Sequence, residues 1–352
     1  MFRRLCLVAI LSFSSAPALA QIAINPDHPD TYVVQVGDTL WDISAVFLRD
    51  PWMWPEIWQI NEQIANPHLI YPGDIVRLVY IDGEPQLVMG NGSGSTVAAA
   101  RPRTDMQTIK LTPQMTSIPL DEAITSIPLD QIREFFTSNR VLTEEEIEVA
   151  PYMVAGQQER IMIGQEDSFY VRGPLTPGIS IYQVFRVGER YRDPETREYL
   201  GYRAEFMGTA RFELQSAEVS KFSITQSTQE VLAGDILLPL QQEDLDPILF
   251  PKVPDINIDA RIISVEGGVT HIGQLDVVAL NKGLDAGLEN GHVMAVLDLG
   301  ERVRDTVNGG RVALPDERAG MLIVFKSLPN MSFALILEAE QPLSVGDTVT
   351  NP

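Results

Sequence analysis

Residues able to carry out hydrolysis are few in this chain and lie far apart. The histidines are His28, His68, His271 and His292, and no H-x-H or H-E-x-x-H spacing occurs among them. A zinc peptidase or amidase needs several His or carboxylate ligands around its metal. His271 and His292, the pair in the C-terminal half, have no obvious third ligand. The sequence therefore predicts no metal site.

The patterns of covalent catalysis are absent from the sequence as well. Cys6 is the only cysteine and lies in a segment expected to be removed, so the mature protein should contain no thiol nucleophile and no disulfide. No G-x-S-x-G motif occurs in the sequence. The run Gly92-Ser93-Gly94 does not form one, and it belongs to a glycine-rich stretch. A lytic transglycosylase needs only one glutamate, but its helical fold does not fit the β-rich C-terminal half. We expect that the chain is not an enzyme and binds no cofactor.

Two groups of charged residues have ordinary structural explanations. The run Thr143-Glu144-Glu145-Glu146 has the capping-box pattern, so its glutamates are expected in a solvated first helical turn rather than around a metal. Two Arg-x-Arg pairs, at residues 190–192 and 302–304, alternate along strand-like runs, which places each pair on one face of a strand. We expect these arginines to pair with neighbouring carboxylates.

The first twenty residues determine the expected compartment. Arg3 and Arg4 are followed by an apolar run from Leu5 to Phe13 and by the small-residue pattern Ala18-Leu19-Ala20. This is the layout of a secretory signal peptide with cleavage after Ala20. The alternative, an uncleaved anchor, is disfavoured because a membrane span needs about 20 apolar residues. We expect residues 1–20 to be a signal peptide and the mature chain to have no transmembrane segment.

The composition limits the choice of partner. The chain has 26 lysines and arginines against 48 aspartates and glutamates, which gives a formal net charge of −22. Without a basic stripe to neutralise phosphates, nucleic acid is excluded as a partner, and so is simple attraction to an anionic surface. Hydrophobic residues make up 45% of the chain, enough to form buried cores. Any ligand must therefore be held by shape and hydrogen bonds.

The elements that would position such a ligand come first along the chain. Thr39 and Asp42 form a capping box, which predicts the start of an amphipathic helix. Pro55 suits the first turn of a second helix. The elements expected from the pattern are a strand at 31–36, a turn at 37–38, a helix at 39–47, a helix at 56–63 and a closing strand at 75–80.

These elements carry the motifs of a known domain. The runs YVVQVGDTLWDIS, WPEIWQIN and NPHLIYPGDIVRL contain V-x-x-G-D-T-L-W-x-I-S, a helical Asn61 and I-x-P-G-D in that order. In these motifs residues 31–81 resemble the LysM domain, a small βααβ module. The resemblance implies binding of glycans that contain N-acetylglucosamine, and therefore of peptidoglycan.

In the LysM family the sugar lies in a shallow groove between two loops. Carried onto this sequence, the resemblance implies that loop backbone groups pair with the amide of an N-acetyl group, while Leu40 and Ile70 cover its methyl group. The implied glycan-binding residues are Gly37, Asp38, Thr39 and Leu40 on the first edge, and Asn66, Pro67, His68, Leu69, Ile70 and Tyr71 on the second.

Some residues of the module have a structural alternative. Trp41, Trp54 and Trp58 are expected to pack its small core rather than to stack on sugar, because so short a domain needs large apolar side chains. Asp38 is either only a helix cap or a cap that also shapes the groove. His68 is expected to be an ordinary loop residue.

A stretch rich in glycine and serine follows the module. Residues 82–108 are predicted to be a flexible linker that lets the module move independently of the rest. Residues 109–172 form a connecting region in which TSIPLD occurs twice, at 116–121 and 125–130, and we interpret the two copies as similar turns. A short helix is predicted over 130–137.

The C-terminal half contains a longer internal repeat. The segment 184–193, VFRVGERYRD, matches the segment 296–305, VLDLGERVRD. The two segments are 112 residues apart, and further matching positions keep this offset. We predict two small β-rich units, at 173–240 and 241–352, with strands at 259–265 and 270–280 before the second. The fold class is therefore α+β and multidomain. The further matching positions are Gly208 with Gly320, and Gly234-Asp235 with Gly346-Asp347.

The arrangement of signal peptide, single LysM module, linker and repeated β-rich half resembles the secretin-associated LysM proteins of type IV pili. This resemblance implies a periplasmic, wall-associated protein that ties an outer-membrane secretin ring to peptidoglycan. Two alternatives stay open: a general wall-bound envelope scaffold unrelated to pili, and a peptidoglycan hydrolase that its LysM module targets to the wall.

Overall fold

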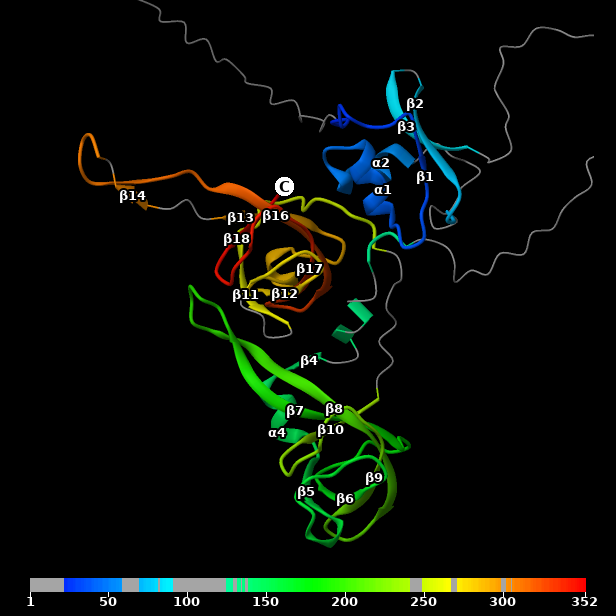
Figure 1. Ribbon diagram of the computed structural model, residues 1–352. Helices are drawn as coiled ribbons and strands as arrows, with labels where there is room; N and C mark the ends of the chain where they lie inside the picture. The colour runs from blue at the N-terminus through cyan, green and yellow to red at the C-terminus, as the bar shows by residue number, and fades with distance from the viewer. Residues whose placement is uncertain are drawn as a thin grey trace, which may run out of the picture.

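The computed structural model describes residues 22–58, 70–81, 83–90, 125–128, 132–133, 135–136, 139–240, 249–266, 271–298, 302–304 and 306–352. Figure 1 shows an N-terminal module in blue and cyan, a green β-rich body, and a yellow-to-red β-rich body between the two. We call the green body the first barrel and the yellow-to-red body the second barrel. Within the described residues no helix has the length and hydropathy needed to cross a membrane.

The N-terminal module has the predicted order of strand, two helices and strand. Its sheet has the order β1-β2-β3 and is antiparallel. The first strand is shorter than predicted, the second helix begins at Trp54 rather than at Glu56, and residues 59–63 lie outside the described residues. The elements are β1 (Thr31–Val33), α1 (Leu40–Phe47), η1 (Pro51–Met53), α2 (Trp54–Trp58), β2 (Ile75–Ile81) and β3 (Glu84–Gly90).

Strand β3 corrects the predicted linker. All seven of its residues pair with β2, and Leu87 is buried in the core of the module. The hairpin turn uses Gly83 at a φ of 91°, a conformation that glycine adopts without strain. The prediction that the linker begins at residue 82 is therefore wrong for 84–90, and residues 91–108 of its range lie outside the described residues.

Helix α1 begins at the capping box that the sequence predicts. The Thr39 hydroxyl accepts a hydrogen bond from the Asp42 amide at 3.2 Å, and the Asp42 carboxylate accepts one from the Thr39 amide at 3.0 Å. These bonds satisfy two N–H groups that a helix start otherwise leaves free. The apolar side of α1 packs into the module core, whose largest members include Leu40, Phe47, Trp54 and Trp58. The predicted core role of Trp54 and Trp58 is confirmed.

The first barrel is a circuit of six strands with a seventh at one side. The six pair in the order β5-β6-β9-β8-β7-β10, and β10 pairs with β5 to complete the circuit. Twelve buried, mainly aliphatic and aromatic side chains fill its interior. The strands are β5 (Tyr152–Gly156), β6 (Ser168–Arg172), β7 (Ile181–Arg192), β8 (Tyr199–Gln215), β9 (Ser220–Ser227) and β10 (Ile236–Pro239), while β4 (Asn139–Leu142) pairs with β8.

Short helices precede the first barrel, as the sequence predicts. Residues 132, 133, 135 and 136, the described part of the helix predicted over 130–137, are helical. Helix α4 (Glu144–Val149) begins at a capping box, because Thr143 and Glu146 exchange hydrogen bonds of 2.9 and 3.2 Å. The acidic run therefore forms a first helical turn. A 3-10 turn, η3 (Gln157–Glu159), follows β5.

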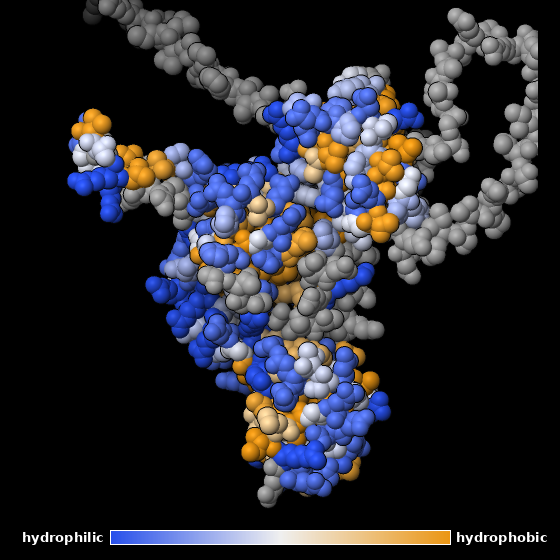
Figure 2. All heavy atoms as spheres, in the orientation of Figure 1, coloured by the Kyte–Doolittle hydropathy of each residue, from blue (hydrophilic) through white to orange (hydrophobic). Residues whose placement is uncertain are grey.

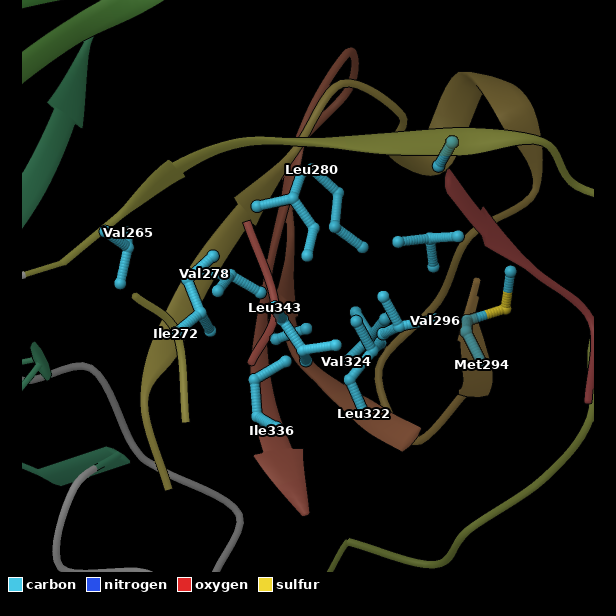
Figure 3. Packing of buried hydrophobic residues seen from close by; sticks show 14 of the residues in the cluster. Val265, Ile272, Val278, Leu280, Met294, Val296, Leu322, Val324, Ile336 and Leu343 are labelled. Atoms are coloured by element: carbon cyan, nitrogen blue, oxygen red, sulfur yellow. The ribbon is translucent and has the colours of Figure 1, made fainter. Parts of the chain in front are cut away.

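The second barrel is a closed circuit of six strands in the order β11-β12-β17-β16-β13-β18. Figure 3 shows its aliphatic interior, where Val278, Leu322 and Ile336 point toward one another. The strands predicted at 259–265 and 270–280 are present, the latter shortened to four residues. The elements are β11 (Ala260–Val265), β12 (Val277–Leu280), η4 (Leu284–Ala286), β13 (Val293–Asp298), β16 (Glu317–Ser327), β17 (Ser332–Ala339) and β18 (Thr348–Thr350).

The long β7–β8 hairpin corrects the partners predicted for its arginines. The Arg190 guanidinium lies over the rings of Tyr199 and Tyr202, 4.9 and 4.8 Å from their centroids. That of Arg192 lies 4.5 Å from the Tyr199 centroid. The expected carboxylate partners are therefore wrong for this pair, and cation–π contacts hold the arginines instead. In the second barrel the corresponding segment forms a separate hairpin, β14 (Arg302–Arg304) and β15 (Arg311–Ala313).

The N-terminal module packs against the second barrel. Trp41 is buried in a cluster with Ile127, Phe135 and residues of the barrel, among them Phe333. Trp41 therefore fills the junction between module and barrel, which corrects its predicted place in the module core. This packing also differs from the independently moving module that the predicted linker implies.

Candidate functional site

The loop between β1 and α1 is closed by a carboxylate. The Asp38 side chain accepts hydrogen bonds from the Tyr32 hydroxyl at 2.9 Å and from the Gln35 amide at 2.7 Å. Burial, and next the hydrogen bond to Asp38, raise the pKa of Tyr32 to about 12. Gly37 has a φ of 94° at the tip of this turn. Asp38 thus shapes the loop, while the helix cap is Thr39.

The second loop is built in the same way. The Asp74 carboxylate accepts a hydrogen bond from the Tyr71 amide at 2.9 Å, and the Asp74 amide donates to the Tyr71 carbonyl at 3.0 Å. Gly73 has a φ of 98°, so the Pro-Gly-Asp part of the motif supplies a tight turn. Asn66, Pro67, His68 and Leu69 lie outside the described residues.

The two loops meet at one end of the module. The Val34 amide donates to the Asp74 carbonyl at 2.9 Å, and the Gly73 amide donates to the Val34 carbonyl at 2.8 Å. These bonds join the end of β1 to the start of β2. Of the two predicted edges, the structure places Leu40 of the first and Ile70 of the second in the same buried cluster.

The side chains predicted to cover an acetyl methyl group do not reach the surface. Leu40 and Ile70 are both fully buried in the module core. Val36, by contrast, is 89% exposed at the tip of the first loop, and Pro72 and Gly73 are exposed on the second. The motifs themselves contain these three residues, because V-x-x-G-D and I-x-P-G-D place turns there. Val36 rather than Leu40 is therefore the apolar side chain of the first loop that is exposed at this end.

A distant segment occupies part of the first edge. The Leu40 amide donates to the Thr125 carbonyl at 2.9 Å, and the Trp41 amide donates to the Ser126 carbonyl at 3.1 Å. Thr39 and Thr125 form a parallel bridge. Residues 125–127 come from the second TSIPLD copy, and they satisfy N–H groups at the start of α1. We call this segment the strap.

Two of the histidines considered for metal binding, His28 and His292, make local hydrogen bonds, and His271 is exposed. The His292 ring nitrogen Nδ1 accepts a hydrogen bond from the Glu289 amide at 3.0 Å, and burial lowers the pKa of His292. His28 Nδ1 lies 3.0 Å from the Pro29 carbonyl. In the described part of the chain no three His, Cys, Asp or Glu side chains are grouped closely enough to hold a metal.

Comparison with known proteins agrees with this geometry. Residues 32–78 match the LysM domain family. A protein of Bacillus subtilis (strain 168), the uncharacterized protein YqbP, is 37% identical over 60 residues, which are 14% of this chain and 27% of that protein. The chain thus spans about a quarter of the length of that relative. The LysM match supports a peptidoglycan-binding module at the N-terminal end of the chain.

Proposed function

We propose that this protein is a non-catalytic anchor, which binds peptidoglycan through its LysM module and holds an envelope complex to the cell wall. The observation that carries the proposal is the LysM match at residues 32–78, on a module whose two loops meet at one end. Asp38 and Asp74 are both engaged in turn hydrogen bonds. Backbone groups and the exposed Val36 suit a neutral acetylated sugar, which is bound by hydrogen bonds and apolar contact.

Compartment and partner are further parts of the proposal. We propose that residues 1–20 export the chain to the periplasm and are removed there, and that the complex it holds is an outer-membrane secretin, as in type IV pili. The charge pattern of residues 3–20 and the order of module and β-rich half support this. One module with a shallow groove binds weakly, so several copies around one ring would gain by avidity, by about 10²–10⁴-fold.

We also infer that the two barrels are copies of one unit. Their strands follow the same circuit order. Val184 lies opposite Gly208 in the first barrel, and Val296 lies opposite Gly320 in the second, so both positions keep the offset of the sequence repeat. All twelve buried residues of the first interior have a buried counterpart in the second, at an offset of 109 before β7 and 112 from β7 onward.

Sedimentation of the protein with purified peptidoglycan tests the glycan part. We expect the Val36→Asp variant to bind about tenfold more weakly, because a carboxylate at the apolar contact costs roughly 1–2 kcal/mol. The matched control is Val345→Asp, an exposed valine of the second barrel, which should sediment like the wild type. Failure of the wild type to sediment would refute the proposed function, whereas equal binding by Val36→Asp would refute only the assigned contact.

Co-purification from envelope extracts tests the partner. The tagged full chain should retain a secretin after mild crosslinking, and it should do so even when Val36→Asp weakens wall binding, because the barrels carry that contact. Recovery of other envelope proteins without a secretin would favour the general scaffold. Recovery of the chain alone would contradict the anchoring role.

A further inference from the structure

The β7–β8 hairpin of the first barrel docks on the second barrel. At its tip the Tyr191 hydroxyl donates to the Glu266 carboxylate at 2.7 Å, and the Tyr191 ring lies 6.0 Å from that of Phe333. The Asp193 carboxylate accepts a hydrogen bond from the Asn281 side chain at 3.0 Å. Tyr191 is buried by this contact. One hairpin tip thus joins the two barrels.

The β14–β15 hairpin stands at the corresponding place in the second barrel. At the offset of the repeat, Val303 corresponds to Tyr191, and Val312 corresponds to Leu200, a neighbour of Tyr191 in the buried junction. Unlike their counterparts, Val303 and Val312 are 39% and 52% exposed. The hairpin projects away from the first barrel and carries both hydrophobic and strongly hydrophilic residues (Figures 1 and 2). A two-stranded sheet by itself is marginally stable in water.

The second barrel receives the β7–β8 hairpin beside β11. The matching surface of the first barrel is exposed. On β11 of the second barrel, Ile263 packs against the junction that holds Tyr191. The corresponding strand of the first barrel is β5, in which Val154 is the counterpart of Ile263 at the offset that holds before β7. Val154 is 44% exposed and Tyr152, on the same side of the strand, is 41% exposed. We call Tyr152 and Val154 the β5 seat.

Carboxylates stand beside the β5 seat on helix α4, whereas the exposed Arg172 lies opposite Tyr152 on β6. Arg304 and Arg311 lie directly opposite one another on the hairpin, and both are exposed. Two like charges so placed destabilise an isolated pair of strands. Helix α4, which leads into β5, carries Glu144, Glu145, Glu146 and Glu148. A carboxylate-rich surface next to the β5 seat would relieve the repulsion between the arginines.

We propose that the β14–β15 hairpin of one molecule docks on the β5 seat of a second copy of this chain. The contact uses the strand position at which the second barrel receives the β7–β8 hairpin within one molecule, but its partners differ, because Lys221 and Arg172 stand at the positions of Phe333 and Asn281. Different surfaces meet in it, so successive copies associate head to tail, and such contacts generate rings or filaments. This inference goes beyond the proposed function and does not depend on glycan binding.

Site-directed crosslinking tests the docking. In the full chain with Cys6→Ser, which has no other cysteine, Val303→Cys and Tyr152→Cys are made in separate proteins. Under mild oxidation the mixture should give a crosslinked dimer at least tenfold above either protein alone. The matched control replaces Tyr152→Cys by Leu214→Cys, an exposed residue of β8 in the same barrel, and it should give no excess. Efficient crosslinking of Val303→Cys to itself, or no product from the mixture, would overturn the proposal.

Solution measurements test the charge contribution separately. In sedimentation velocity, the wild type should self-associate with increasing concentration, and Arg304→Glu with Arg311→Glu should weaken this at least tenfold. Both side chains are exposed, so the fold should be retained. Adding Glu145→Arg and Glu148→Arg should restore association. A wild type that stays monomeric at high concentration, or a double variant that associates as before, would contradict the docking.

Discussion

Two barrels with the same strand order present opposite outer surfaces. On the first barrel, Lys221 and Glu213 form an ion pair at 2.8 Å. Their counterparts in the repeat, on the second barrel, are Phe333 and Phe325, whose rings lie 4.5 and 5.3 Å from that of Phe135. A solvated ion pair in one barrel is thus a hydrophobic contact in the other.

The difference extends along the outer faces of the two sheets. In the second barrel Met321, Ile323 and Leu335 are buried beneath neighbouring segments, and their counterparts in the first barrel are Thr209, Arg211 and Ser223. At the offsets of 109 and 112, each of the twelve buried residues of the first interior falls on a buried residue of the second. Among the described residues, the module, the short helix that carries Phe135 and the first barrel all pack on the outer face of the second barrel.

Exchanging the two outer pairs should have the largest effect. Phe325→Glu with Phe333→Lys removes two buried rings and buries two charges, which should lower the free energy of unfolding by roughly 4 kcal/mol or more. Urea unfolding followed by tryptophan fluorescence measures this, because the four tryptophans, at positions 41, 52, 54 and 58, lie in the module that packs on this barrel.

The reverse exchange is the control for this prediction. Glu213→Phe with Lys221→Phe alters only a partly exposed pair, so the loss should stay below about 1 kcal/mol. Equal losses of unfolding free energy from the two exchanges would contradict the contrast between a buried hydrophobic contact and a partly exposed ion pair.

A pair of glycine substitutions should have intermediate and equal effects. A Cβ atom at Gly208 would lie 2.4 Å from the Gln226 carbonyl oxygen, and one at Gly320 would lie 2.4 Å from the Glu338 carbonyl oxygen. Gly208→Ala and Gly320→Ala should each destabilise their own barrel by about 1–3 kcal/mol. Hydrogen exchange measured by mass spectrometry separates the barrels, and a markedly unequal pair of losses would contradict equivalent interiors.

Features encoded by neighbouring residues were predictable from the sequence. The capping boxes at Thr39 and Thr143 were correct because each consists of a hydroxyl and a carboxylate three residues apart. The loops of the glycan module were likewise recognisable, since Gly37 and Gly73 adopt the positive φ that their motifs require. The repeated motif at 184–193 and 296–305 was also visible in the sequence.

Features that depend on distant contacts were not predictable. Trp41 has the same local pattern as a core residue of the module, and only the remote Ile127 and Phe333 make it a junction residue. Strand β3 forms because β2 offers it a partner edge, although its sequence continues into a glycine-rich stretch. The buried state of Leu40 follows in the same way from the packing of α1, which its motif does not specify.

A substitution in the strap tests whether the junction on the second barrel holds the strap against helix α1. Ile127 is fully buried in that junction, so Ile127→Asp should expel the strap and leave the Leu40 and Trp41 amides without their carbonyl partners. We expect these two amides to exchange about 10–100-fold faster in hydrogen-exchange NMR. Ile127→Val is the matched control and should change little. Unchanged exchange in the aspartate variant would contradict the strap contact.

The smallest expected effect is a difference in pH response between two glutamates of the two barrels. Burial raises the pKa of Glu266 at the junction, although the Tyr191 hydroxyl donates to it. A hydrogen bond from Lys221 lowers the pKa of Glu213 on the exposed face. The contribution of Glu266 to stability is therefore complete below its ordinary value of 4.5 and is lost as the pH rises through its folded pKa.

Glu213 should behave in the opposite sense, because its stabilising contribution is present above pH 4.5 and is lost as the pH falls through its folded pKa. As the pH rises toward 7, the wild type should lose stability, and the Glu266→Gln variant should not show this loss. Denaturant unfolding between pH 4 and 7 measures the difference. In measurements extended to about pH 3, Glu213→Gln should leave that loss in place and reduce the stability gained as the pH rises toward 4.5. If both variants changed the same part of the pH profile, the carboxylates of Glu266 and Glu213 would not differ in the way that their buried and exposed positions predict.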